Sequence, residues 1–64
     1  STGEFIRNIR LKKAYELLSV PGKNISEVCY DVGFNSHSYF TACFNEMYKM
    51  TPSEYVKSLK LKSA

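Results

Sequence analysis

Apolar side chains recur at helical spacing through the middle of the chain. Between residues 24 and 33, those that share one helical face are Val28, Cys29 and Val32. Asn24 or Ser26 stands ahead of them as a candidate N-cap, because both residue types accept hydrogen bonds from the first amides of a helix. Gly33 follows, and glycine suits the left-handed conformation that ends many helices. The pattern predicts a short helix that stops at Gly33.

A second helix is predicted over about residues 36–48, with Ser36 as its N-cap. The residues that fall within about 100° of one another on its helical wheel are Phe40, Cys43, Phe44 and Met47. Residues 49–52 then break the helix, and Pro52 can start another. Two short helices joined by a turn with glycine are typical of a helix-turn-helix, whose second helix enters the major groove of DNA. Any helical hairpin shows the same pattern, so the pattern alone leaves both interpretations open.

The first helix, over about residues 1–19, changes its apolar side halfway along. Its early apolar residues, which share a sector of about 100°, are Phe5, Ile6 and Ile9. The later ones, which fall about 180° to 280° from Phe5, are Leu11, Ala14, Tyr15 and Leu18. A helix on a single core would keep one stripe. We therefore expect the later stripe to pack on residues 25–60, and the early one to be partly exposed or buried against another molecule.

Taken together, these segments predict an all-α fold, a small helix-turn-helix (homeodomain-like) bundle of about four helices. A chain of 64 residues has room for one small core. We expect one folded domain, in which residues 1–19 form a linker helix and residues 20–64 form the helix-turn-helix unit.

The string GFNSHSYFTACFNEMYKMTPSEY resembles the motif that closes the DNA-binding domain of AraC/XylS-type bacterial transcription regulators. The matching positions are Gly33, Phe34, Ser38, Tyr39, Phe40, Phe44, Thr51, Pro52, Ser53 and Tyr55. The upstream stretch IRLKKAYELL is similar to the linker helix of that family, so the resemblance covers nearly all of the chain. It implies a cytoplasmic transcription regulator whose partner is double-stranded DNA. It also implies a parent protein with a first helix-turn-helix unit and a sensory domain.

The chain also resembles itself at an offset of 50 residues. Aligning residues 4–14 with residues 54–64 gives eleven pairs, of which ten match in chemical type or nearly so. Such a period fits one helix-turn-helix unit, and it predicts a tandem repeat whose first unit lies upstream. Two basic amphipathic helices can also look alike by chance.

The candidate base contacts are four residues opposite the apolar stripe of the second helix, with His37 near the start of that helix. They are His37, Ser38, Thr41, Ala42 and Asn45. Asn45 can bond to adenine through two hydrogen bonds, hydroxyl groups can bond to several bases, and the Ala42 methyl can touch thymine. A small, polar, solvated face is the alternative. Many family members carry Arg and Lys where this chain has Ala42 and Asn45, so we expect a weaker grip on DNA.

Candidate phosphate contacts surround that helix. They are Ser26, Ser36, Tyr39, Lys49 and Thr51. The start of the helix near Ser26 is expected to attract phosphate through its positive dipole end. Lys49 stands where the family usually has Gly, so a left-handed residue there would cost about 1 kcal/mol. Contacts of this kind position a protein without reading sequence.

Composition narrows the classes of function. Net charge is +3, with basic residues gathered on the first and last helices, which is useful near phosphates. No catalytic constellation appears around His37, the one histidine, so we expect no enzyme, no cofactor and no metal site. Cys29 and Cys43 fall on core-facing positions, where cysteine behaves as a small hydrophobe. No apolar run could span a bilayer.

Two other functions compete with DNA binding. A helical protein-interaction module would use exposed Phe5, Ile6 and Ile9 as its docking face. A basic amphipathic C-terminus, VKSLKLK, would lie on anionic lipid, although seven residues bind a membrane poorly.

Overall fold

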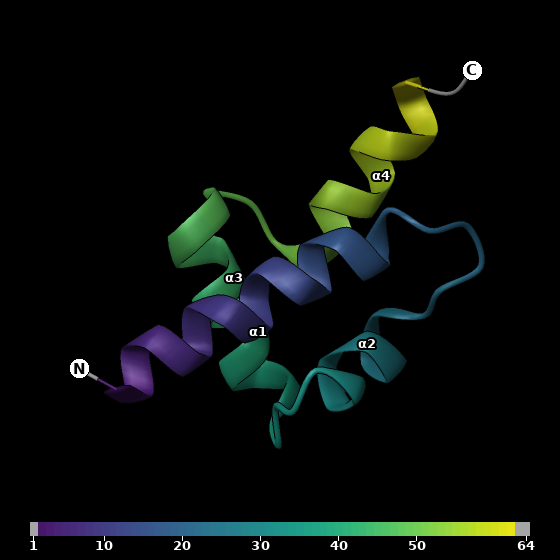
Figure 1. The fold of residues 1–64 in the computed structure, drawn as a ribbon. Helices are drawn as coiled ribbons and strands as arrows, with labels where there is room; N and C mark the ends of the chain where they lie inside the picture. Colours follow the sequence, from purple (N-terminus) through teal and green to yellow (C-terminus); the bar gives the residue numbers. More distant parts are fainter. Residues whose placement is uncertain (1, 63–64) are drawn as a thin grey trace.

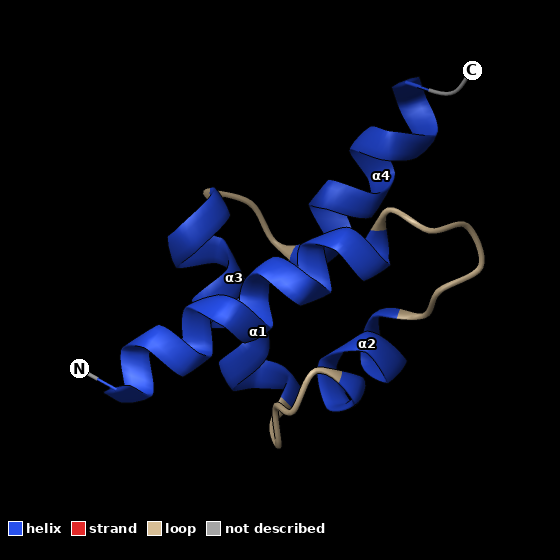
Figure 2. Ribbon diagram, viewed as in Figure 1, coloured by secondary structure: helices blue, strands red, loops and turns tan. Residues whose placement is uncertain are grey.

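This computed structural model describes residues 2–62, which contain four α-helices joined by loops (Figure 1). They are α1 (Thr2–Leu18), α2 (Ile25–Asp31), α3 (His37–Tyr48) and α4 (Pro52–Lys62). No strand occurs in this part, which confirms the predicted all-α fold (Figure 2). Ser1 and residues 63–64 lie outside the described residues. The first residue of the predicted linker helix (1–19) and the last two of the predicted helix-turn-helix unit (20–64) are therefore not described, nor are the two repeat pairs that involve residues 63 and 64.

The helices pack in chain order, α1 on α2, α2 on α3, and α3 on α4. In Figure 1, α1 crosses the molecule and its N-terminal end projects at one side, while α4 projects at the other. The molecule is accordingly elongated, with principal extents of 41 × 21 × 18 Å. One helix, α1, therefore runs past the whole helix-turn-helix formed by α2 and α3.

The start and stop of α2 follow from local hydrogen bonds. The Asn24 side-chain oxygen accepts from the Ser26 amide at 2.8 Å, so Asn24 is the N-cap of the two candidates. At the other end, the Gly33 N–H donates to the Tyr30 carbonyl at 3.1 Å and the Phe34 N–H donates to the Cys29 carbonyl at 3.0 Å. With Gly33 at φ +108°, this pair of bonds is a Schellman motif, and the predicted stop is confirmed.

Helix α3 is capped at both ends as the sequence predicts. The Ser36 hydroxyl oxygen accepts from the Tyr39 amide at 3.3 Å. At its C-terminus, Lys49 takes the left-handed conformation at φ 62°, and its N–H donates to the Asn45 carbonyl at 2.7 Å. Helix α4 begins with a capping box, because the Thr51 amide donates to the Glu54 carboxylate at 2.9 Å while the Glu54 amide donates to the Thr51 hydroxyl at 3.1 Å.

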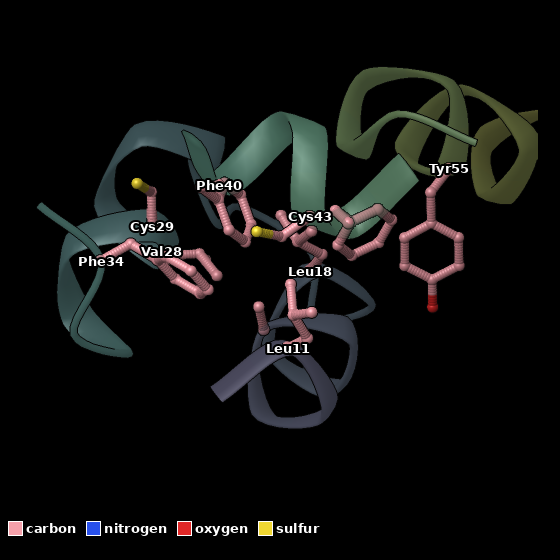
Figure 3. Close-up of a cluster of buried hydrophobic side chains, with 10 residues drawn as sticks. Leu11, Leu18, Val28, Cys29, Phe34, Phe40, Cys43 and Tyr55 are labelled. Carbon is pink, nitrogen blue, oxygen red and sulfur yellow. The ribbon is translucent and has the colours of Figure 1, made fainter. Parts of the chain in front are cut away.

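One cluster of buried side chains holds the helices together (Figure 3). Its members are Leu11, Ala14, Leu18, Val28, Cys29, Phe34, Phe40, Cys43, Phe44 and Tyr55. Phe40 and Phe44 are fully buried, and their rings meet edge-on with centroids 5.9 Å apart. The core assignment of Phe34, Phe40, Phe44 and Tyr55 is therefore confirmed.

Both cysteines are buried and free, as expected for core-facing positions. The Cys29 thiol donates to the carbonyl of Ser36 at 3.8 Å, which ties the end of α2 to the cap of α3. Burial raises the pKa of this thiol above its ordinary value, so the neutral, hydrogen-bonding form is favoured.

The change of apolar side along α1 is also confirmed. Phe5, Ile6 and Ile9 are 67%, 42% and 51% exposed, whereas the later stripe is buried at positions 11, 14 and 18. Tyr15 keeps 38% exposure, yet its ring stacks on that of Tyr55 with centroids 4.3 Å apart. The C-terminal half of α1 thus joins the core, and the N-terminal half carries an apolar surface that nothing in the described chain covers.

Gly33→Ala is expected to lower the free energy of unfolding by roughly 1 to 3 kcal/mol, because alanine is strained at positive φ. A Cβ there would also lie 2.9 Å from Arg10 Nε, so the arginine side chain would have to move. Urea denaturation followed by circular dichroism measures the change. Gly3→Ala is the matched control, since it is helical with no atom within 4 Å of its Cβ and should leave stability unchanged or slightly raised. Equal stability of Gly33→Ala and the wild type would contradict the assignment of Gly33 as a left-handed helix stop.

Lys49→Gly is expected to raise the free energy of unfolding by about 1 kcal/mol, because glycine adopts the left-handed conformation without steric strain. The greater conformational freedom of glycine in the unfolded chain offsets part of this gain. Lys49→Ala removes the same charge but keeps the Cβ, so its stability should stay within about 0.5 kcal/mol of the wild type. The same denaturation measurement compares them. If the two variants gain stability equally, charge and not backbone conformation explains the effect.

Candidate nucleic-acid interface

The five predicted base-contact residues lie together on the solvent side of α3. His37, Ser38, Ala42 and Asn45 are exposed, and Thr41 is half-buried. Ser38, Ala42 and Asn45 stand opposite the buried rings of Phe40 and Phe44. Thr41 and His37 lie toward one flank, about 60° and 20° from Phe44 on the helical wheel. We call these five residues the outer face of α3. It offers an amide, two hydroxyls, an imidazole and one methyl group.

One flank of the outer face is bounded by α2 and α4. A shallow hollow is lined there by Ile25, His37, Thr41, Thr51, Pro52 and Ser53. It brings the first turns of α2 and α4 next to α3. Ser26 follows Ile25 in the exposed first turn of α2, so two predicted phosphate contacts, Ser26 and Thr51, belong to this side.

The other flank is bounded by the N-terminal half of α1. Tyr39 is 53% exposed at the edge of the outer face, and its ring lies against that of Phe34 with centroids 5.9 Å apart. A hydrogen bond with the Tyr39 side chain raises the pKa of the Arg7 guanidinium, which stays charged in any case. Arg7 and Arg10 line a second hollow on this side, together with Ser36 and Tyr39.

Several of the backbone donors near these positions already have partners. The Ser26 amide bonds to Asn24, the Tyr39 amide to Ser36, and the Thr51 amide to Glu54. What these positions offer to a phosphate is therefore their side-chain hydroxyl groups. Lys49 is exposed at the C-terminal end of α3 and offers an ammonium group.

The sequence places basic residues on the first helix but does not show what they face. Arg7 and Arg10 fall on the same face of α1 as Ala14 and Leu11, about 140° to 240° from Phe5 on the helical wheel. This spacing can be read from the sequence. What the two arginines face becomes clear only from the packing of α1 beside the turn between α2 and α3. Their position next to Tyr39 is thus a finding of the structure.

Among residues 2–62, no group of three or more His, Cys, Asp or Glu side chains is arranged to hold a metal ion. Within the same range, none of the helices has the length and apolar character needed to cross a membrane.

Comparison with known proteins gives consistent matches. Residues 1–58 match a family model described as a helix-turn-helix domain. The chain is 43% identical over 53 residues to the uncharacterized HTH-type transcriptional regulator YdeC of Bacillus subtilis, a match that covers 83% of this chain. It is 43% identical over 56 residues, 88% of its length, to the HTH-type transcriptional regulator AdiY of Escherichia coli. It is also 50% identical over 52 residues, 81% of its length, to histidine kinase P4 of Formosa agariphila.

In each case the matched region is a small part of the relative. The chain spans 18% of YdeC, 22% of AdiY and 4% of histidine kinase P4. No solved structure matches the chain significantly.

Proposed function

Because this chain belongs to the AraC-type family of helix-turn-helix bacterial transcription regulators, we propose that it reads DNA sequence by inserting α3 into the major groove. The observation that carries the proposal is the outer face of α3. Five small or polar side chains lie on one side of a helix that is capped at both ends and buried on the other side. An α-helix is about 10–12 Å across and the major groove about 12 Å wide, so such a helix fits with its outer face toward the bases.

Each residue of the outer face has a role that its chemistry allows. Asn45 bonds to adenine through its amide oxygen and nitrogen, and Ser38 and Thr41 bond to base edges through their hydroxyls. The Ala42 methyl contacts a thymine methyl, and His37 reaches a base near the start of the helix. The proposed register on the duplex comes from backbone phosphates bound by Ser26, Ser36, Tyr39, Lys49 and Thr51.

The chain is further proposed to be the second helix-turn-helix unit of a longer regulator. Residues 1–19 would be the linker helix and residues 20–64 the unit itself. The exposed Phe5, Ile6 and Ile9 support this, since they form an apolar surface of the kind that a first unit would cover. The 50-residue self-similarity supports it as well. We propose that the parent protein also carries a sensory domain and acts in the cytoplasm. The helix-turn-helix unit itself would catalyse no reaction.

A protein-interaction module is the second candidate, and the same exposed apolar residues favour it. Affinity for duplex DNA as a function of salt separates the two. For DNA binding we expect weak affinity, a dissociation constant of roughly 10⁻⁴ to 10⁻⁶ M, that falls steeply as salt rises because phosphate contacts release counterions. Fluorescence anisotropy of a labelled duplex between 50 and 200 mM salt, roughly the range over which such contacts are screened, provides the measurement. An affinity that does not respond to salt, or no binding at the lowest salt, would leave the interaction module as the better explanation.

Asn45→Ala and Lys49→Ala are expected to differ in kind. Asn45→Ala should change preference at one base pair by about 1 to 3 kcal/mol, because it removes a hydrogen-bonding pair to one base edge. Lys49→Ala should weaken binding to all sequences alike and make the salt slope shallower by about 1. A panel of duplexes that differ at single positions, titrated with each variant, measures both effects. If Asn45→Ala loses the same affinity on every duplex, its assigned role in base recognition is wrong.

A further inference from the structure

Two arginines occupy the face of α1 that points at the helix-turn-helix. Toward the C-terminus this face consists of Leu11, Ala14 and Leu18, all buried in the core. One turn earlier the same face carries Arg10 and then Arg7. The face therefore changes from apolar to cationic where α1 passes the turn between α2 and α3. Neither arginine belongs to the core or to the outer face of α3.

The two guanidinium groups share one surface hollow, which we call the arginine hollow. The lining residues that matter here are Arg7, Arg10, Gly33, Asn35, Ser36 and Tyr39. No carboxylate lines it, and its volume of about 240 Å³ is several times the ~30 Å³ that one water occupies in the liquid. Glu4 lies with Arg7 in the adjoining hollow, and its charge is the smallest of the effects that raise the Arg7 pKa. The arginine hollow thus combines two permanent positive charges with hydroxyl and amide groups.

Both arginine side chains lie against the helix-turn-helix. The Arg10 side chain lies over Gly33 so closely that a Cβ on Gly33 would be 2.9 Å from Arg10 Nε and 3.1 Å from Cζ. Arg7 interacts with the Tyr39 side chain from α3. The planar set of donors on each guanidinium matches the oxygens of a phosphate.

The arginine hollow also lies where a DNA backbone would pass. Tyr39 stands at the edge of the outer face of α3, on the flank opposite Thr51. Because a helix nearly fills the width of the major groove, its two flanks face the two phosphate-lined walls. The hollow containing Thr51 would meet one wall, and the arginine hollow the other.

We propose that the arginine hollow binds a phosphate of the DNA backbone, so that α1 contacts DNA directly through Arg7 and Arg10. This rests on the proposed function of the chain as a DNA reader. It assigns to α1 a role in binding besides that of joining two units. Arg7 and Arg10 then position α3 in the groove, and they read no sequence.

The test compares two double variants of the whole chain in duplex binding. Arg7→Gln with Arg10→Gln removes both charges from the arginine hollow. Lys12→Gln with Lys13→Gln removes two charges from exposed positions of the same helix, on faces that point away from the hollow. The arginine variant is expected to make the slope of log affinity against log salt shallower by about 2, and its base preference should not change. The lysine variant should change the slope by less than about 0.5.

A charge-conserving double variant and a titration with inorganic phosphate complete the test. Arg7→Lys with Arg10→Lys keeps the charge and should restore most of the slope, while circular dichroism checks that every variant folds. Equal losses for the arginine and lysine variants would overturn the proposal, because net charge alone would explain them. A steep salt slope unchanged by the arginine variant would overturn it while the proposed function stands, whereas no duplex binding by the wild type would overturn both. Titration of the wild type with inorganic phosphate, observed by NMR, tests binding of a free anion. If the Tyr39 signals shift while the arginine variant leaves the salt slope of duplex binding unchanged, the hollow is a site for free phosphate and the proposal is wrong.

Discussion

The position of α3 depends on the burial of Phe40 and Phe44. A chain of this size buries only about 60% of its unfolded surface, so its stability rests on few side chains, and these two rings are fully inaccessible at the centre of the core. They pack with the C-terminal half of α1 and with Phe34 and Tyr55. Since side chains on an α-helix repeat every 3.6 residues, burying these rings places Ser38, Ala42 and Asn45 on the opposite, solvent side, with Thr41 and His37 along its flank.

Helix α1 serves more than the core. Its C-terminal half contributes buried side chains, and Tyr15 stacks on Tyr55 to join the far end of α1 to α4. Its N-terminal half has two uses that do not compete, because they lie on different sides of the helix. Phe5, Ile6 and Ile9 form an exposed apolar surface, and Arg7 and Arg10 reach the turn before α3. A rigid helix with these three surfaces would couple the orientation of whatever covers the apolar side to that of α3.

The chemistry of the proposed interface divides between its centre and its edges. The outer face of α3 holds no lysine or arginine, so base recognition would rely on a few neutral hydrogen bonds and one methyl contact. Positive charge lies instead at the margins, on α1 and at Lys49. Lys49 accepts an unfavourable left-handed backbone, where glycine would be less strained. Charge that affects all sequences equally is thus separated from the groups that distinguish bases.

Periodicity and capping residues alone predicted the helices, the stops at Gly33 and Lys49, the caps at Ser36, the core rings and the change of side along α1, because these features depend on residues within about one turn of each other. The outer face of α3 followed from the same wheel. The structure alone distinguished Asn24 from Ser26 as the cap. The stacking of Tyr15 on Tyr55 and the meeting of Arg7 with Tyr39 were decided by tertiary packing. Such contacts join residues far apart in the chain, or select between equivalent local partners. The two contacts made by α1 depend on the angles at which it crosses α3 and α4, and those angles are set by how whole side-chain surfaces fit together.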